Sequence, residues 1–187
     1  KASKLAMQLL SQMESISRQT IYDLQSSLSA ELAEDYFGAA TTFVAAEIDQ
    51  ITRKAKILSV GDSRAYLIDA QGKWQQITQD HSILSELLTD FPDKKEEDFA
   101  TIYGGVSSCL VADYSEFQDK IFYQEIEMKQ GESLLLCSDG LTDGLSAEVR
   151  EKIWKQYDND KSRLTVCRKL IAKQGFYDDL SVIICAF

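Results

Sequence analysis

The sequence predicts an α+β fold in which helices pack outside antiparallel sheets. The hydrophobic period is close to 3.6 at both ends of the chain, which is typical of amphipathic helices. It changes to about 2 between residues 41 and 78, which is typical of strands. The turns between these strands are too short for the helical crossovers that parallel strands need. No repeat or low-complexity segment divides the chain, so residues 1–187 are interpreted as one domain.

Helices are expected at both ends of the chain. Residues 2–14 and 18–34 each carry an apolar stripe at helical spacing, and Gly38 follows the second helix as a stop. A short helix is expected at 82–89. Near the end, Ser146 begins one helix, and another spans about 160–174.

Strands occupy the middle of the chain. Four of them, at 41–48, 56–60, 64–69 and 74–78, are expected to form one antiparallel meander. The charged stretch 90–100, which holds the only proline, is interpreted as an exposed flap anchored by Phe91, Phe99 and the pair Gly104-Gly105. A further strand is expected at 121–127.

Two apolar runs carry acidic residues at their ends. Leu134–Ser138 predicts a buried strand and is followed by Asp139-Gly140, a turn signal. Ser181–Phe187 predicts a second buried strand and is preceded by Asp178-Asp179. If these strands are antiparallel neighbours, Asp139 and Asp178 meet at one rim. Two carboxylates that close repel each other unless a proton or a cation intervenes, and oxygen ligands favour Mg²⁺ or Mn²⁺.

Charge and cysteine usage exclude several classes of function. The formal net charge of −10 argues against a nucleic-acid or anionic-membrane surface, since both need a basic patch. The four cysteines form no C-x-x-C pair, which indicates a reducing compartment without a zinc site and therefore a cytoplasmic protein. No apolar stretch approaches the roughly 20 residues of a membrane span.

Five motifs occur in order along the whole chain, and together they resemble the metal-dependent protein serine/threonine phosphatases of the protein phosphatase 2C family, bacterial branch. The motifs are Gly38-Ala39-Ala40-Thr41-Thr42, Val60-Gly61-Asp62-Ser63-Arg64, Ile77-Thr78-Gln79-Asp80-His81-Ser82, Leu135 to Asp143, and Asp178-Asp179-Leu180-Ser181-Val182-Ile183. The resemblance implies a four-layer α-β-β-α sandwich, in which two stacked antiparallel sheets are flanked by helices.

The resemblance also implies roles for particular residues. Asp139 and Asp178 match the aspartates that hold the first catalytic metal. Asp80 matches an aspartate of a third, looser metal site beside the flap. Asp139 and Asp143 are implied to be shared with that third ion or adjacent to it. The implied reaction is attack on phosphorus by a water that Mn²⁺ or Mg²⁺ activates. The implied partner is a phosphorylated protein, the substrate of a bacterial serine/threonine kinase.

Structural alternatives remain open for each of these residues. Asp139 and Asp143 each precede a glycine, so each could be a turn aspartate only. Asp178 could belong to a helix-to-strand loop, and Asp62 is interpreted as a structural turn residue. The only histidine, His81, is interpreted as a hydrogen-bonded loop residue rather than a metal ligand.

Some pieces of the family pattern are absent from the sequence. The phosphate-gripping arginine and an Asp-Gly-x-Gly-Gly turn precede the first helix in the family, so catalytic residues are expected upstream of Lys1 and the domain is expected to lack its opening strands. Leu110-Val111 also stands where relatives have Leu-Gly. The alternative hypothesis is therefore a non-catalytic binding module, which could form a dimer through exposed sheet edges. A phosphatase of an anti-sigma pathway is a third hypothesis.

Overall fold

The structure is a computed structural model that describes residues 1–99, 105–117, 120–175 and 179–187. The chain forms two compact units, each built from several separate stretches. The first unit comprises Lys1–Glu47, Lys56–Asp62 and Gln79–Glu125, and the second comprises Ile48–Ala55, Ser63–Thr78 and Ile126–Phe187. The single domain expected over 1–187 stays a prediction.

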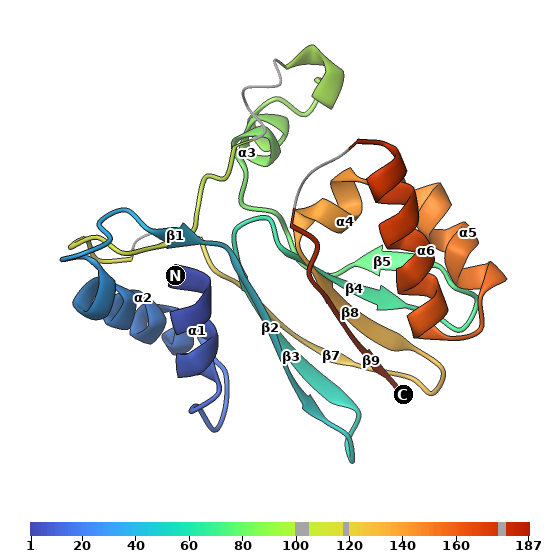
Figure 1. Ribbon diagram of the computed structural model, residues 1–187, viewed down its shortest axis with the longest axis horizontal. Helices are drawn as coiled ribbons and strands as arrows, with labels where there is room; N and C mark the ends of the chain where they lie inside the picture. Colours follow the sequence, from blue (N-terminus) through green and yellow to red (C-terminus); the bar gives the residue numbers. More distant parts are fainter. Residues whose placement is uncertain (100–104, 118–119, 176–178) are drawn as a thin grey trace. The chain divides into compact units, whose positions relative to one another are not determined.

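Helices form close to where the periodicity predicts them (Figure 1). They are α1 (Ala2–Leu10), α2 (Arg18–Leu32), α3 (Ile83–Asp90), the 3₁₀ turn η1 (Glu96–Asp98), α4 (Asp139–Asp143), α5 (Ala147–Gln156) and α6 (Asp160–Lys173). The predicted cap of α5 is confirmed, because the Ser146 side chain accepts a hydrogen bond from the Val149 amide. The first helix is shorter than predicted and ends at Leu10.

The strands fall into three sheets. They are β1 (Ala40–Thr41), β2 (Phe43–Asp49), β3 (Lys54–Val60), β4 (Arg64–Ile68), β5 (Trp74–Gln76), β6 (Leu110–Val111), β7 (Phe122–Glu127), β8 (Ser133–Cys137) and β9 (Val182–Ala186). The sheet orders are β1-β6, β2-β3-β7 and β5-β4-β8-β9.

The predicted four-strand meander is wrong, because the chain changes sheets between β3 and β4. Gly61 lies at this point with φ +101°, a conformation that side chains rarely adopt. A Cβ on Gly61 would also lie 2.5 Å from the Thr42 methyl group. Gly61 therefore ends β3 and redirects the chain, so β4 pairs with β5 and β8 in another sheet.

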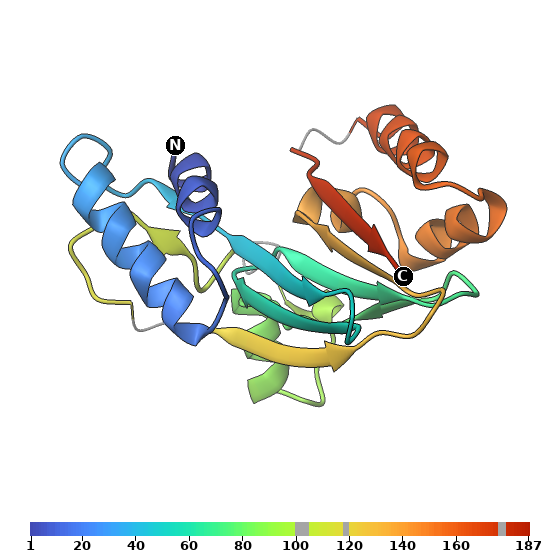
Figure 2. The ribbon, with the colours of Figure 1, turned by 90° about the horizontal axis from the view of Figure 1, so that it is seen from below.

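The core of the first unit lies between α1, α2 and strands β2 and β3. Figure 2 shows the two helices side by side. Ile21, Leu24 and Leu28 on α2 are fully buried, and they contact Leu58 and Val60 of β3 in one apolar cluster. The helical stripe predicted from the sequence is thus the face that packs inward.

The second unit is a four-stranded sheet with α5 and α6 on one face (Figure 1). β8 pairs antiparallel with both β4 and β9. Leu134 and Leu135 of β8 are buried, as predicted. The prediction that β9 is buried is wrong, because β9 is the last strand of its sheet and Ile183 is 62% exposed. An apolar run alone does not distinguish a central strand from an edge strand.

The predicted flap, residues 90–100, begins at the last residue of α3 and contains η1. The rings of Phe91 and Phe99 lie against each other with centroids 6.5 Å apart, so the two predicted anchors do contact each other. Ala100 and Gly104, which belong to the same prediction, lie outside the described residues.

Candidate functional site

The rim where β8 ends and β9 begins is fixed by backbone and hydroxyl hydrogen bonds. The register pairs Cys137 with Val182. One residue further, the Ser138 amide donates to the Ser181 carbonyl at 3.1 Å. The Ser138 hydroxyl donates to the Asp179 carbonyl at 2.9 Å and accepts from the Ser181 amide at 3.0 Å. The predicted antiparallel neighbours are therefore confirmed, and Asp139 follows directly on a fixed rim.

Asp139 and Asp143 lie on one short helix rather than in turns. Asp139 is the first residue of α4 and Asp143 is the last. Gly144, which suggested a turn, has φ −78° and is needed for a different reason. A Cβ there would lie 2.8 Å from a carbon of Ile171 on α6 and 3.0 Å from the Gly140 carbonyl oxygen. Close packing of α4 on α6 thus explains the glycine and places the two carboxylates one helical turn apart.

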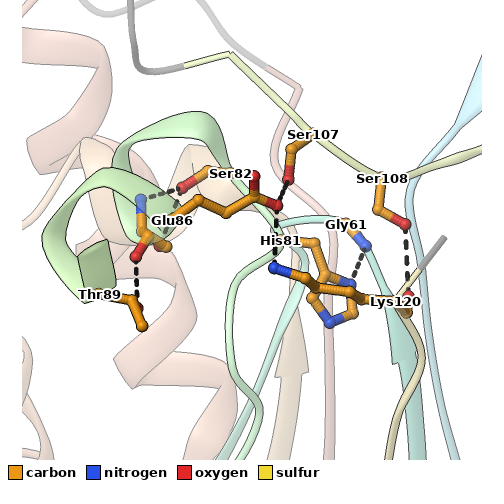
Figure 3. A network of polar contacts seen from close by, with 9 residues as sticks. Gly61, His81, Ser82, Glu86, Thr89, Ser107, Ser108 and Lys120 are labelled. Atoms are coloured by element: carbon orange, nitrogen blue, oxygen red, sulfur yellow. Dashed lines mark hydrogen bonds and ion pairs between the residues drawn. The ribbon is translucent and has the colours of Figure 1, made fainter.

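Asp80 lies in a loop of the first unit beside His81, whose backbone and ring are both held. The His81 amide donates to the Gly61 carbonyl at 2.9 Å, and the His81 carbonyl accepts from the Ser107 amide at 2.9 Å. The Gly61 amide donates to Nδ1 of the imidazole at 3.2 Å (Figure 3). A ring nitrogen that accepts a hydrogen bond carries no proton. His81 is buried and serves as a structural residue of the loop, as the sequence suggested.

Glu86 on α3 joins two segments that are distant in the sequence (Figure 3). Its carboxylate accepts a 2.7 Å hydrogen bond from the Ser107 hydroxyl and lies 3.3 Å from the Lys120 ammonium. The Ser107 hydrogen bond, and after it Lys120, lowers the pKa of Glu86 below its usual value. This network ties α3, which precedes the predicted flap, to two segments that follow it.

A cavity of about 380 Å³ in the first unit is lined by Asp80, His81 and Glu86 together with Arg18 and Lys120. Arg18 donates to the Ile121 carbonyl at 2.8 Å. Sequence reasoning missed Arg18, Glu86 and Lys120, because isolated charges on helix faces and in loops form no motif. Their grouping depends on contacts between residues up to 103 positions apart.

The four predicted metal ligands are not all placed by the structure. Asp80 belongs to the first unit and Asp139 and Asp143 to the second. Asp178 lies outside the described residues. Within the described ranges, no group of three or more His, Cys, Asp or Glu side chains is positioned to hold a metal ion. The site therefore stays a prediction, although carboxylate donors on a fixed rim suit a hard divalent cation.

None of the helices among the described residues is long and apolar enough to cross a membrane.

Comparison with known families gives one match over most of the chain. Residues 2–166 match the family model described as Protein phosphatase 2C. The serine/threonine phosphatase stp of Listeria monocytogenes is 30% identical over 198 aligned residues, which cover 98% of this chain and 77% of that protein.

Solved structures share the fold. The serine/threonine phosphatase Stp1 from Staphylococcus aureus aligns with a TM-score of 0.81 at 24% identity, over 99% of this chain and 76% of that chain. The catalytic domain of the serine threonine protein phosphatase PstP, in complex with two manganese ions, aligns with a TM-score of 0.75 at 22% identity, over 98% of this chain and 79% of that chain. Both likenesses concern the α+β architecture of helices and antiparallel sheets.

Proposed function

Because the chain belongs to the protein phosphatase 2C family, as a protein serine/threonine phosphatase of the bacterial type, we propose that it hydrolyses phosphoserine and phosphothreonine in proteins. The observation that carries this proposal is the β8–β9 rim. Asp139 directly follows Ser138. The amide and hydroxyl of Ser138 form hydrogen bonds with the backbone of Asp179 and Ser181. The backbone from which the Asp139 carboxylate extends is thereby held in place, which favours a pre-positioned side chain.

The family also suggests the finer architecture. We propose that the sheets stack as the inner layers of an α-β-β-α sandwich with helices outside. In support, α1 and α2 cover the core of the first unit, and α5 and α6 cover one face of the β5-β4-β8-β9 sheet.

The proposed metal ligands are Asp139 and Asp178, with Asp80 and Asp143 for a further ion. Mn²⁺ or Mg²⁺ bound there would supply Lewis-acid activation of water and neutralise the phosphoryl oxygens. An all-carboxylate donor set favours such hard ions over zinc. The chain itself contributes the positions of these aspartates. The Ser138 contacts hold the rim, and α4 sets Asp143 one turn from Asp139.

The proposed partners follow from the reaction. The substrate is a phosphoprotein made by a bacterial serine/threonine kinase, and the proposed location is the cytoplasm. We also propose a dimer formed through exposed sheet edges, because β9 is the last strand of its sheet. Sedimentation tests this dimer.

The experiment compares phosphate release from a phosphothreonine peptide in the presence of Mn²⁺ by the wild type and by Asp139→Asn. Loss of a residue that merely orients a metal ligand commonly costs 10–100-fold, so loss of a ligand should reduce kcat/KM by about 100-fold or more. Calorimetric titration with Mn²⁺ should show weaker binding by the same variant.

Asp158→Asn is the matched control, because Asp158 is an exposed aspartate of the same unit. It should retain wild-type phosphate release and Mn²⁺ binding. Equal phosphate release by the wild type and Asp139→Asn would contradict the proposal. Mn²⁺ binding without any turnover would favour the alternative of a non-catalytic binding module.

A further inference from the structure

A groove of about 630 Å³ runs along α2 in the first unit, and none of the candidate metal ligands lines it. One side is α2, from Tyr22 to the residues just past its end, and the other side is the segment 114–117 that follows β6. We call it the α2 groove. Among the described residues, its lining contains two carboxylates, Glu34 and Glu116, and no lysine or arginine.

The floor of the α2 groove is rigid. Gln25 is 3% exposed, and its side-chain amide bonds the backbone of β6 in both directions. The amide nitrogen donates to the Val111 carbonyl at 2.7 Å, and the amide oxygen accepts from the Val111 amide at 3.0 Å. The Gln25 side chain thus pairs with both the backbone amide and the backbone carbonyl of Val111. These two hydrogen bonds tie α2 to β6, which directly precedes the segment 114–117.

Aromatic side chains line both walls of the α2 groove, and two of them, Tyr22 on α2 and Tyr114 on the facing segment, are exposed. Tyr22 and Phe117 pack edge to face with centroids 5.8 Å apart. Tyr114 lies 6.0 Å from Phe37, and these two side chains are 76% and 69% exposed. Large apolar side chains gathered on a surface usually mark an interaction site.

A cation–π contact lies close in the sequence to the groove residue Glu34, on a ring that does not itself line the groove. The ammonium of Lys1 lies 3.2 Å from the ring centroid of Tyr36, which neighbours Phe37 in the chain. Aromatic faces attract cations through the negative charge of the ring face, and nearby carboxylates add a Coulomb attraction. Rings together with Glu34 and Glu116 are therefore complementary to a lysine or arginine side chain.

We propose that the α2 groove binds a basic segment of the phosphoprotein substrate. This inference rests on the proposed phosphatase function, because that function supplies the class of partner. The groove gives the enzyme a preference for substrates that carry lysine or arginine outside the phosphorylated residue. Binding there stabilises the ground state and the transition state equally, so it lowers KM and leaves kcat unchanged.

The first test needs no hydrolysis. A fluorescent, unphosphorylated peptide of lysine, glycine and serine is titrated with the full chain, and anisotropy is measured. Glu34→Gln and Glu116→Gln should each weaken binding about 2- to 5-fold, as expected for exposed ion pairs. Tyr114→Ala should weaken it by a similar factor without any change in charge.

The matched control is Glu31→Gln, an exposed glutamate of α2 that does not line the groove. It removes the same charge, so it reports the general attraction between the peptide and a protein of net charge −10. Binding by Glu31→Gln that equals the wild type supports the proposal. Equal weakening by Glu31→Gln and Glu34→Gln, or wild-type binding by Tyr114→Ala, would overturn it.

The second test separates the groove from the catalytic proposal. Glu34→Gln should raise KM about 2- to 5-fold for a lysine-rich phosphopeptide, with kcat unchanged, and should leave hydrolysis of p-nitrophenyl phosphate unaltered. If no substrate is hydrolysed, the phosphatase proposal fails while the anisotropy result still decides the groove. Peptide-independent self-association in sedimentation, abolished by Tyr114→Ala, would assign the groove to a second copy of the chain and overturn the proposal.

Discussion

The hydrophobic cores of the two units are built from different kinds of side chain. The first unit packs mainly aliphatic side chains of α1 and α2 against its strands. The second unit packs aromatic rings edge to face. The ring centroid of Trp74 lies 4.6 Å from that of Trp154, on α5, and 5.2 Å from that of Tyr66. The guanidinium of Arg150 is buried among them, 5.1 Å from the rings of both Tyr66 and Trp74.

The two units also differ in where their charged side chains lie. In the second unit, Nε and Nη1 of Arg150 and Nε1 of Trp74 are buried without a hydrogen-bond partner among the described residues. Such atoms lose their hydration, and the cation–π contacts offset part of that loss. The first unit also buries one such atom, Oγ of Ser59, but it places its charged contacts near the surface, at Glu47 and Glu86. Specific substitutions can test this contrast.

The largest effect is expected in the first unit, at the glycine that ends β3. Gly61→Ala adds a Cβ that would lie 2.5 Å from the Thr42 methyl and 3.2 Å from the Thr42 Cα, at φ +101°. Steric overlap and backbone strain together should lower the free energy of unfolding by about 3 kcal/mol in urea denaturation followed by circular dichroism.

Gly38→Ala is the control for strain alone. Gly38 has φ +77°, and an added Cβ would meet nothing within 4 Å. Its cost should be about 1 kcal/mol, the usual penalty for a left-handed residue. Equal costs at the two glycines would show that the close approach to Thr42 contributes nothing.

An intermediate effect is expected in the second unit, at the buried arginine. Arg150→Ala removes the packing of a long side chain between two rings and should cost about 2 kcal/mol. Arg150→Met keeps most of that volume and removes the unpartnered N–H groups, so its cost should stay below about 1 kcal/mol. Tryptophan fluorescence measures this directly, because both tryptophans of the chain, Trp74 and Trp154, lie in this unit.

The two arginine variants also test whether the units differ in the cost of buried, unpartnered polar atoms. Equal losses for Arg150→Ala and Arg150→Met would mean that the guanidinium itself stabilises the second unit. The unpartnered atoms would then carry no net cost, and the two units would not differ in this respect.

The sequence predicted the parts of the fold that depend on local pattern. Two apolar runs with acids at their ends correctly predicted that β8 and β9 are antiparallel neighbours. The α2 stripe correctly predicted its buried face. The predicted meander is wrong because local turns do not reveal which sheet a strand joins. The chain passes from one sheet to another at Gly61, where a Cβ would overlap the Thr42 side chain.

The site was harder to predict than the fold for a physical reason. Two glycines within six residues concealed the helix α4, because Gly140 and Gly144 read as turn signals although Gly144 serves packing against Ile171. Glu86 and Lys120 meet across 34 positions, and no local period encodes such a pair. Motifs identify residues that bind a common ligand, whereas the contacts that position a flap depend on the folded chain.

The smallest effect is expected at Glu47 in the first unit, and it depends on pH. The carboxylate accepts hydrogen bonds from the Ser15 hydroxyl at 2.6 Å, the Lys56 ammonium at 2.9 Å and the Ile16 amide at 2.8 Å. These bonds, with that of Ser15 the largest contribution, lower the pKa of Glu47 from 4.5 to about 2. The side chain is 35% exposed, so screening limits its contribution to about 1 kcal/mol or less.

The sign of the pH dependence follows from the lowered pKa. The folded state favours the ionised form, so the stabilisation is present above pH 4.5 and is lost as the pH falls toward 2. Glu47→Gln should therefore be less stable than the wild type by up to about 1 kcal/mol at pH 7, and the difference should vanish near pH 2. Glu14→Gln, at an exposed glutamate of the same unit, should match the wild type throughout. A Glu47→Gln deficit that is the same at pH 7 and pH 2 would mean that the side chain acts through packing, and the contrast with the buried arginine of the second unit would then lose its electrostatic basis.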